Sequence, residues 1–448
     1  MQASKSFLRR FSPEALSMTF IMDIGIDSSI GIDKITGQRF KANLPEETRI
    51  ISSKVLAGTY KFTNYRQKLI SKGSKEPPRE LCIPTVRDKV ALKALTKVLE
   101  DVFEDRCKTP PPQPIIQSIL QNMQDGKFDS FIKLDIKRFY GSVKHDKLLR
   151  VLRRKIRKHE ILSLIEKAIS TPSVAMGIKA RSKREIGLPE GLSISNRLAN
   201  IYVQDIDQLF ESNGNIAYYR YVDDVLILCQ AADAKQIEQQ AYQAVEKLSL
   251  KLHPDNSGKT KLGKVGFDSF EYLGYVFSDK GIAPRKQSVL NLERWIDSHM
   301  REWHKANNLD YWKWKLSLRI TGCRTTEDGI SFNRFGWLFY FSQSTNAAIP
   351  HKLDALLCKL AKRYNVELPK DLPTFSKSYY EIHYRNGEGS YIQLIDFSLS
   401  VEKKREILTR LYDNKFAPGL KDEDVDCVFR RRMLQEAKRL ERDIGSVS

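Results

Sequence analysis

The sequence predicts an α+β fold, with a core of alternating strands and helices followed by a mainly helical last third. In the middle of the chain, short apolar runs bounded by turn residues recur between segments with apolar residues at helical spacing. Beyond residue 285 the spacing is mostly helical, apart from the strand-like stretch SYIQLIDFSLSV. An α+β core with a helical addition is the class that this order of elements favours.

The first clear elements lie between residues 65 and 126. YRQKLISKGSKEPPRE predicts a basic loop punctuated by Gly and Pro. The segment 86–103, VRDKVALKALTKVLEDVF, has apolar residues at helical spacing and predicts an amphipathic helix. TPPPQP at 109–114 is excluded from a helix interior and predicts a linker or loop. IIQSILQNMQDG, which follows it, predicts a second helix ended by Gly126.

The central elements alternate in type. FDSFIKLDIKRFYGSV predicts a strand through Leu134, and HDKLLRVLRRKIRKHEILSLIEKAI predicts one helix over 145–169. SNRLANIYVQDIDQLF and AKQIEQQAYQAVEKLSLKL predict helices on either side of a strand, YRYVDDVLILC at 219–229. FDSFEYLGYVFS predicts a hairpin strand, and residues 285–345 predict helix rich in Trp and in Lys or Arg.

The composition points to a polyanionic partner. The 448 residues contain 75 Lys plus Arg against 55 Asp plus Glu, a formal net charge of +20. Such an excess favours binding to nucleic acid, although a basic protein without that partner is an alternative. The N-terminus has no apolar signal-peptide core, no stretch is apolar enough to span a membrane, and the cysteines form no CxxC pair. We therefore expect a cytoplasmic protein without a zinc site or disulfide scaffold; the oligomeric state stays open.

Two adjacent carboxylates interrupt the predicted strand at 219–229. Asp223 and Asp224 are costly there unless a divalent cation neutralises them. Two-metal phosphoryl-transfer sites hold ions about 3.5–4 Å apart, and they need a further carboxylate. Asp135, at the end of the strand in FIKLDIKRFY, is the natural candidate, although alone it would be a turn or N-cap residue.

Four motifs together resemble reverse transcriptases: RELCIPTVRDKVALKAL, KLDIKRFYGSVKHDKLL, GLPEGLSISNRLANIYV and YVDD, followed by HPDNSGKT and FEYLGYVF. Their order and intervals are similar to the fingers and palm of that family over about residues 50 to 285. The resemblance implies a right-hand polymerase, with fingers and palm at 1–285, a helical thumb at 286–350 and a helical C-terminal extension at 351–448.

The resemblance also implies roles for the carboxylates and for one aromatic residue. Asp135, Asp223 and Asp224 match the family's metal ligands, and the Ile136 carbonyl would contact one ion. Two Mg²⁺ ions, or Mn²⁺ as an alternative, would then be the cofactors. Tyr140 matches the steric gate that excludes a ribonucleotide 2′-hydroxyl. The alternative is that Tyr140 is simply an aromatic residue of the core.

Further matches concern the nucleotide and the primer. Arg79 matches the arginine that grips the triphosphate, a task that suits a planar guanidinium. Lys72 or Lys75 could assist it or simply be solvated, and Lys259 matches a lysine near the leaving pyrophosphate. The family's primer grip corresponds to Tyr272, Leu273 and Gly274.

One motif departs from the family pattern, which reads P-Q-G and then S-P. Here Pro189 is followed by Glu190 and Gly191, and Ser195 by Asn196. Glu190 and Gly191 would lie near the nascent base pair. A carboxylate there could alter the choice of template or nucleotide, or pair locally with Arg184 or Arg197. The metal ligands are untouched.

The resemblance predicts an RNA-directed DNA polymerase that uses dNTPs, an RNA template and a DNA product. Residues 351–448 show no nuclease, integrase or RNase H signature, so the chain resembles most the bacterial group II intron-like reverse transcriptases of the defence-associated and abortive-infection groups. We therefore expect a dedicated non-coding RNA template and a role in antiphage defence. The alternatives are untemplated or protein-primed synthesis, with Tyr379, Tyr380 and Tyr384 as conceivable acceptors, and a non-catalytic RNA-binding protein.

Overall fold

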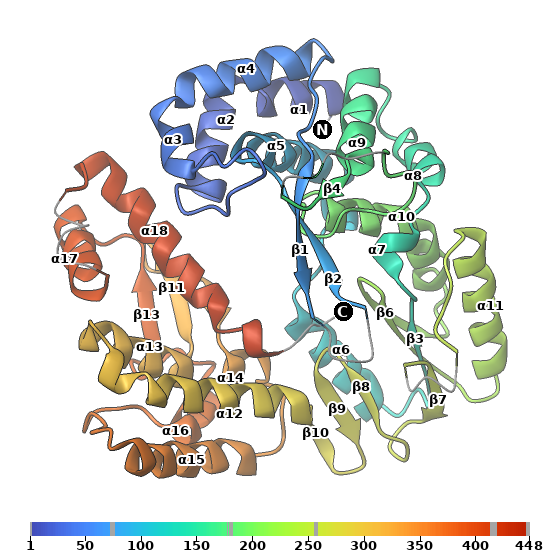
Figure 1. Ribbon diagram of the computed structural model, residues 1–448. Helices are drawn as coiled ribbons and strands as arrows, with labels where there is room; N and C mark the ends of the chain where they lie inside the picture. Colours follow the sequence, from blue (N-terminus) through green and yellow to red (C-terminus); the bar gives the residue numbers. More distant parts are fainter. Residues whose placement is uncertain are drawn as a thin grey trace. The chain divides into compact units, whose positions relative to one another are not determined.

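The computed structural model describes residues 2–71, 77–176, 178, 182–254, 259–412 and 419–444. The chain forms two compact units, the first from residues 1–110 and 128–262 and the second from 111–127 and 263–448 (Figure 1). Both units contain helices and strands, which confirms the α+β class. This division differs from the three-part division into fingers and palm, thumb and extension, which stays a prediction.

The first unit surrounds its strands with helices. These helices are α1 (Ala3–Arg10), α2 (Pro13–Thr19), α3 (Gly37–Ala42), α4 (Leu44–Leu56), α5 (Val86–Phe103), α7 (Phe139–Ser142), α8 (His145–Leu152), α9 (His159–Ser170), α10 (Ser195–Glu211) and α11 (Ala234–Lys247). A π-helical turn spans Phe20–Ile24, and a 3₁₀ turn spans Glu104–Cys107.

Two sheets lie in this part of the chain. One has the order β2-β1-β4, from β1 (Tyr65–Ile70), β2 (Arg79–Ile83) and β4 (Ser173–Val174). The other, hereafter the palm sheet, has the order β5-β6-β3-β7, from β3 (Ser130–Asp135), β5 (Ala217–Tyr221), β6 (Asp224–Cys229) and β7 (Lys261–Lys264). Helix α10 packs on β5 and α11 on β3. Because these helices cover the central strands, the sequences of those strands are runs of apolar residues.

Helix α5 matches the predicted bounds and explains the motif that begins it. The Thr85 side chain caps the helix by accepting from the Asp88 N–H. The buried Asp88 carboxylate accepts hydrogen bonds from the Tyr60 hydroxyl at 2.8 Å and the Thr63 N–H at 3.1 Å. Burial is the largest influence on Asp88 and raises its pKa, while these hydrogen bonds oppose the rise. Asp88 therefore anchors the chain before β1 to the start of α5.

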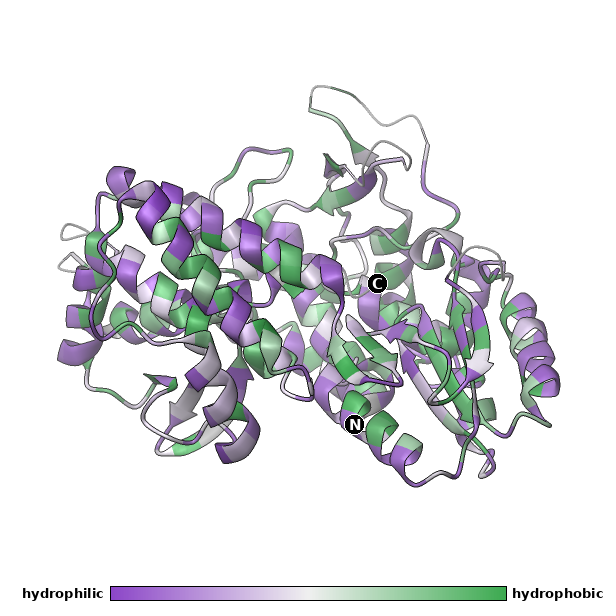
Figure 2. Cartoon of the chain, turned by 90° about the horizontal axis from the view of Figure 1, so that it is seen from below, coloured by the Kyte–Doolittle hydropathy of each residue, from purple (hydrophilic) through white to green (hydrophobic). Residues whose placement is uncertain are grey.

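The second unit is richer in helix. Its helices are α6 (Pro112–Gln124), α12 (Lys286–Arg301), α13 (Leu309–Thr321), α14 (Trp337–Tyr340), α15 (Ala348–Tyr364), α16 (Phe375–Arg385), α17 (Val401–Leu411) and α18 (Asp422–Arg439), with 3₁₀ turns at Trp303–Lys305 and Arg442–Ile444. Its long helices carry hydrophobic and hydrophilic residues on different faces (Figure 2). No helix in the described part of the chain combines the length and apolar character needed to cross a bilayer.

Two small sheets complete the second unit. β8 (Phe270–Tyr272), β9 (Tyr275–Ser278) and β10 (Gly281–Pro284) form an antiparallel meander. β11 (Cys323–Glu327) pairs antiparallel with β12 (Ile330–Phe335) and parallel with β13 (Gln393–Asp396). The hairpin expected from FEYLGYVF and the strand in SYIQLIDFSLSV are therefore confirmed.

Two predictions of helix are wrong. The segment 145–169 is two helices, because the chain leaves helical geometry between Leu152 and His159, where Ile156 turns into the core. Within 285–345 a hairpin, β11–β12, replaces helix. Its turn contains Asp328 and Gly329 with φ of 52° and 77°, a pair of left-handed residues that favours a tight hairpin.

Candidate active site

The adjacent aspartates lie at a hairpin turn rather than inside one strand. β5 and β6 pair antiparallel, with Tyr221 opposite Asp224, so that Val222 and Asp223 form the turn. Val222 has a φ of 57°, a costly conformation for a β-branched residue. The Arg220 guanidinium donates to the Val222 carbonyl at 2.9 Å and to the Asp207 carboxylate at 2.6 Å. These bonds hold the strained turn that presents Asp223.

The palm sheet brings the third carboxylate to the same place. In the antiparallel pairing of β3 with β6, Asp135 stands directly opposite Asp224. The Ile136 N–H donates to the Asp223 carbonyl at 3.0 Å, which ties the end of β3 to the hairpin turn. Asp135, Asp223 and Asp224 therefore share one end of the sheet, as the sequence predicted.

Basic side chains accompany these carboxylates. His253 Nε2 lies 3.2 Å and Lys259 Nζ 3.9 Å from Asp135 Oδ1, while Lys133 Nζ lies 3.7 Å from Asp224 Oδ1. Sequence reasoning missed Lys133 and His253. Lys133 precedes Asp135 by two residues in one strand, so period-two alternation places both on one face and could have revealed it. His253 lies far along the chain, and only pairing of its neighbourhood with β3 brings it here.

The electrostatics show how closely the carboxylates crowd one another. Burial is the main cause that raises the pKa of Asp224 to about 7; Lys133 opposes the rise, and Asp135 and Asp223 add to it. Among the described residues, no group of three or more His, Cys, Asp or Glu side chains is gathered as a metal site. The donor atoms of Asp135, Asp223 and Asp224 are nevertheless all carboxylate oxygens, which fits a hard divalent cation.

Two of the predicted nucleotide-binding residues, Arg79 and Glu190, lie near Tyr140. Burial raises the pKa of the Tyr140 phenol to about 12, the nearby carboxylates of Asp223 and Glu190 add to the rise, and Arg79 opposes it. Tyr140 lies in α7, and its carbonyl accepts from the Leu188 N–H at 2.7 Å. The structure thus gathers the proposed gate, the proposed phosphate-binding arginine and one metal-ligand candidate in a single neighbourhood.

Glu190 has a partner that the sequence did not suggest. Its carboxylate pairs with Arg79, and its carbonyl accepts from the Cys82 N–H at 2.8 Å. Arg184 pairs instead with Glu80 at 3.2 Å, and Arg197 with Glu100 at 2.8 Å. The expected local pairing through Arg184 or Arg197 is therefore wrong, because β2 brings Arg79 closer.

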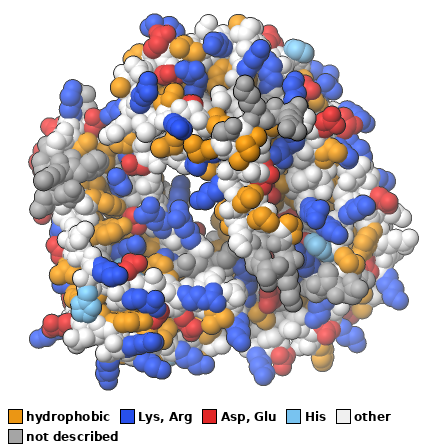
Figure 3. Space-filling view, viewed as in Figure 1, with side chains coloured by type: hydrophobic (Ala, Val, Ile, Leu, Met, Phe, Trp, Pro, Cys, Tyr) orange, Lys and Arg blue, Asp and Glu red, His pale blue; other side chains and the backbone are white. Residues whose placement is uncertain are grey.

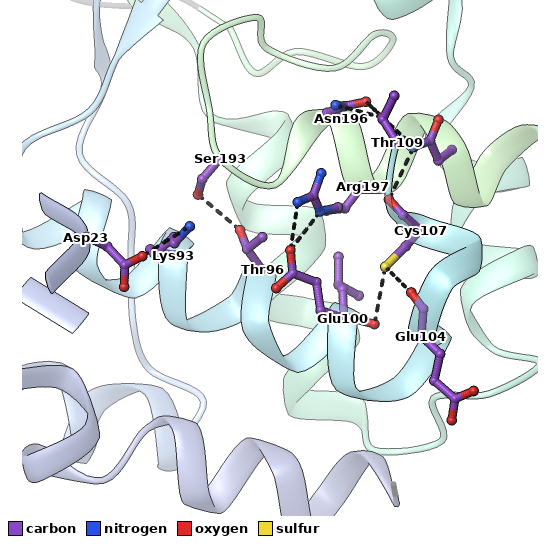
Figure 4. Close-up of polar contacts among 12 residues, drawn as sticks. Asp23, Lys93, Thr96, Glu100, Glu104, Cys107, Thr109, Ser193, Asn196 and Arg197 are labelled. Carbon is purple, nitrogen blue, oxygen red and sulfur yellow. Dashed lines mark hydrogen bonds and ion pairs between the residues drawn. The ribbon is translucent and has the colours of Figure 1, made fainter. Parts of the chain in front are cut away.

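Asn196, the second departure from the family pattern, joins a network between α10 and the end of α5 (Figure 4). Its amide donates to Thr109 Oγ1 at 3.2 Å. Thr96 Oγ1 donates to Ser193 Oγ at 3.0 Å, and the Arg197–Glu100 ion pair lies between these contacts. A proline side chain has no donor, so the family's usual residue could not make this contact.

Gly191 is needed where the Glu190 loop meets β2. Its φ is +98°, and a Cβ there would lie 2.9 Å from the Cys82 carbonyl oxygen. We expect Gly191→Ala to lower the free energy of unfolding by about 1–3 kcal/mol. Urea denaturation of both proteins checks this. Gly214→Ala is the control, because nothing lies within 4 Å of that site. Equal effects of the two changes would refute the close-packing explanation.

The remaining candidates fall elsewhere. Tyr272, Leu273 and Gly274 lie in the second unit at the β8–β9 turn, where Leu273 and Gly274 have φ of 49° and 78°. The Tyr272 and Leu273 side chains are buried, and the Leu273 carbonyl accepts from the Tyr340 hydroxyl at 2.9 Å. Their role as a primer grip stays a prediction. Lys72 and Lys75 lie outside the described residues.

A family model for reverse transcriptase (RNA-dependent DNA polymerase) matches residues 70–277. The Escherichia coli protein YkfC is 26% identical over 291 residues, covering 55% of this chain and 74% of its own length. The group II intron-encoded protein LtrA of Lactococcus lactis is 28% identical over 169 residues, covering 36% of this chain. That match spans only 28% of the LtrA chain.

Among solved structures, telomerase from Candida albicans in complex with a fragment of telomeric RNA covers 91% of this chain and 68% of its own. It has 12% sequence identity and a TM-score of 0.41. A truncated apo telomerase from Candida tropicalis covers 50% of this chain, with 16% identity and a TM-score of 0.38.

Proposed function

We propose, from the premise that this chain belongs to the reverse transcriptase family through residues 70–277, that it copies RNA into DNA at the end of the palm sheet that carries the three carboxylates. Those residues are the polymerase domain of an RNA-directed DNA polymerase, with the right-hand polymerase fold of that family. The observation that carries the proposal is the pairing of Asp135 opposite Asp224 beside the turn that presents Asp223.

The carboxylates would hold the divalent ions that this family generally uses. We assign Asp135, Asp223, Asp224 and the Ile136 carbonyl as ligands and Mg²⁺ as the ion, with Mn²⁺ as an alternative. Bound there, two ions would activate the primer 3′-hydroxyl and stabilise charge on the phosphates. Lys133, 3.7 Å from Asp224, and His253, 3.2 Å from Asp135, would keep the carboxylates in place before ions arrive.

The chain's own side chains would position the nucleotide. Arg79 would bind the triphosphate after exchanging its Glu190 partner for phosphate oxygens. Tyr140, half-buried beside Asp223, would stop a ribonucleotide at its 2′-hydroxyl. Lys259, half-exposed and 3.9 Å from Asp135, would stabilise charge on the departing pyrophosphate.

RNA is the proposed template and DNA the product. The net charge of +20 supports a polyanionic partner, and Lys and Arg side chains are spread over the visible face of each unit (Figure 3). We further propose that the template is a dedicated non-coding RNA and that the product acts in antiphage defence. A phage challenge of cells carrying wild type or Asp223→Ala tests the second statement.

Protein-primed synthesis is the second candidate, because two of the suggested acceptors are accessible. Tyr380 and Tyr384 are 50% and 67% exposed on α16, whereas the Tyr379 hydroxyl donates to the Ser344 carbonyl at 2.9 Å. Tyr380 and Tyr384 are thus the better acceptors. A DNA-linked peptide mapped to either tyrosine would favour this route.

The deciding experiment is to purify the protein, supply dNTPs and Mg²⁺, and compare an RNA template carrying an annealed primer with primer alone. We expect extension only with template, giving DNA complementary to it, and none from an Asp223→Asn, Asp224→Asn double variant. Extension without template would point to untemplated synthesis. RNA binding with no synthesis under either condition would leave the non-catalytic RNA-binding protein as the function.

A further inference from the structure

A cavity lies wholly inside the second unit, between α13, the end of α17 and α18. Its volume is about 500 Å³, and we call it the α13–α18 pocket. Its lining includes Tyr311, Lys315, Tyr412, Arg432, Glu436 and Arg439. A cavity of this size is within the range of small-molecule sites, which is about 300–1,000 Å³.

One wall of the pocket is aromatic. The Tyr311 and Tyr412 rings lie 5.5 Å apart between centroids, tilted by 44°. Trp312, which also lines the pocket, is fixed by its indole N–H, which donates to the His299 carbonyl at 2.9 Å. Tyrosine rings held by neighbouring helices provide flat surfaces on which a planar ligand can stack.

Positive charge exceeds negative charge around these rings. The Arg432 guanidinium lies 5.2 Å from the centre of the Tyr412 ring, and Lys315 Nζ lies 5.7 Å from that of Tyr311. The Glu436 carboxylate already has partners within the protein, because it pairs with Arg439 and accepts a hydrogen bond from the Tyr311 hydroxyl at 3.2 Å. Within the described part of the chain, Lys315 makes no ion pair. The pocket therefore favours an anion beside the rings.

The Tyr412 hydroxyl supplies a directional donor. Its oxygen is buried, and across the residues that the structure describes it takes part in no hydrogen bond. Burial first, and then the Glu436 charge, raise the pKa of Tyr412, so the hydroxyl keeps its proton at neutral pH. A buried donor of this kind is stabilised when a ligand oxygen accepts from it.

We propose that the α13–α18 pocket binds one nucleotide, with its base against Tyr311 and Tyr412 and its phosphate beside Lys315 and Arg432. The chemistry is a planar base joined to an anion, and it could come from a free nucleotide or from an unpaired nucleotide of bound RNA. The site is built entirely from residues of the second unit, so it is separate from the carboxylates of the palm sheet and does not depend on the proposed polymerase activity.

Photocrosslinking to the full chain tests the inference with two probes. One is 4-thiouridine 5′-monophosphate, and the other is a single-stranded oligouridylate containing one 4-thiouridine. Crosslinked peptides are mapped by mass spectrometry, which separates this pocket from the polymerase site. We expect crosslinks at Tyr311 or Tyr412, reduced about fivefold or more by Lys315→Gln and by Tyr412→Phe.

Lys313→Gln is the matched control, since Lys313 lies on the same helix but does not line the pocket. Circular dichroism confirms that each variant is folded. If the monophosphate crosslinks, the ligand of the pocket is a free nucleotide. If only the oligouridylate crosslinks, the ligand is a nucleotide of bound RNA. Both outcomes support the proposed pocket. Crosslinks only at other peptides, or equal losses from Lys313→Gln and Lys315→Gln, would overturn it.

Discussion

Replacing Asp224 with Asn is expected to reduce DNA synthesis by about a thousandfold and to stabilise the metal-free protein at pH 8. The loss of synthesis follows because the change removes one of the carboxylates proposed to hold the ions. The gain in stability follows because burial beside Asp135 and Asp223 raises the pKa of Asp224 from its ordinary value of 3.8 to about 7. The closeness of the three carboxylates is thus what the proposed metal binding requires, and it also lowers the stability of the metal-free fold.

The sign of the pH dependence is set by which state binds more protons. Between pH 4 and pH 7 the folded protein holds the Asp224 proton more tightly than the unfolded chain, so stability falls as pH rises through that window. Asparagine carries no such penalty. The gain from Asp224→Asn is therefore expected to be about 2–4 kcal/mol at pH 8 and near zero at pH 4.

Urea denaturation in EDTA at the two pH values measures this difference, and primer extension measures activity. Asp233→Asn is the control, because Asp233 is exposed just before α11 and has no part in the carboxylate group. Mg²⁺ is expected to stabilise wild type more than Asp224→Asn, since ions bind the folded site. An inactive variant whose gain in stability over wild type is no larger at pH 8 than at pH 4 would contradict the assigned crowding.

Changing Arg79 and changing Glu190 should move nucleotide binding in opposite directions. Arg79→Ala is expected to raise KM for dNTPs by about tenfold to a hundredfold, because the variant loses a charge-assisted hydrogen bond to phosphate and such bonds contribute free energy of that size. Glu190→Gln is expected to lower it by about threefold to tenfold, because the incoming triphosphate no longer competes with a carboxylate for the guanidinium. Steady-state kinetics with one dNTP varied measures both.

The same strand offers a matched control. Glu80 is adjacent to Arg79 on β2 but pairs with Arg184 at 3.2 Å, so Glu80→Gln removes a comparable ion pair from a different arginine. We expect KM to change little in that variant. If Glu190→Gln leaves KM unchanged while Arg79→Ala raises it, Arg79 binds phosphate but Glu190 does not hold it back.

Much of the site could be predicted because its residues lie in short local motifs. Asp135 ends an apolar run, and Asp223 and Asp224 interrupt another, so residue type and spacing alone suggested a shared edge, which the β3–β6 register confirms. The sequence did not reveal that Val222 takes a left-handed conformation and splits the predicted strand into a hairpin. Propensity favours a strand at valine, but the Arg220 guanidinium donates to the Val222 carbonyl and is itself held by Asp207 of α10, and these contacts stabilise the turn.

By itself the sequence determined the α+β class, the order of the polymerase motifs and the carboxylates at the end of the palm sheet. Only the tertiary structure decided that Glu190 pairs with Arg79, 111 residues away, and that α13, α17 and α18 enclose a basic aromatic pocket. The physical reason is that periodicity and residue type act locally along the chain. The partner of a charge and the walls of a cavity depend on which distant segments pack together.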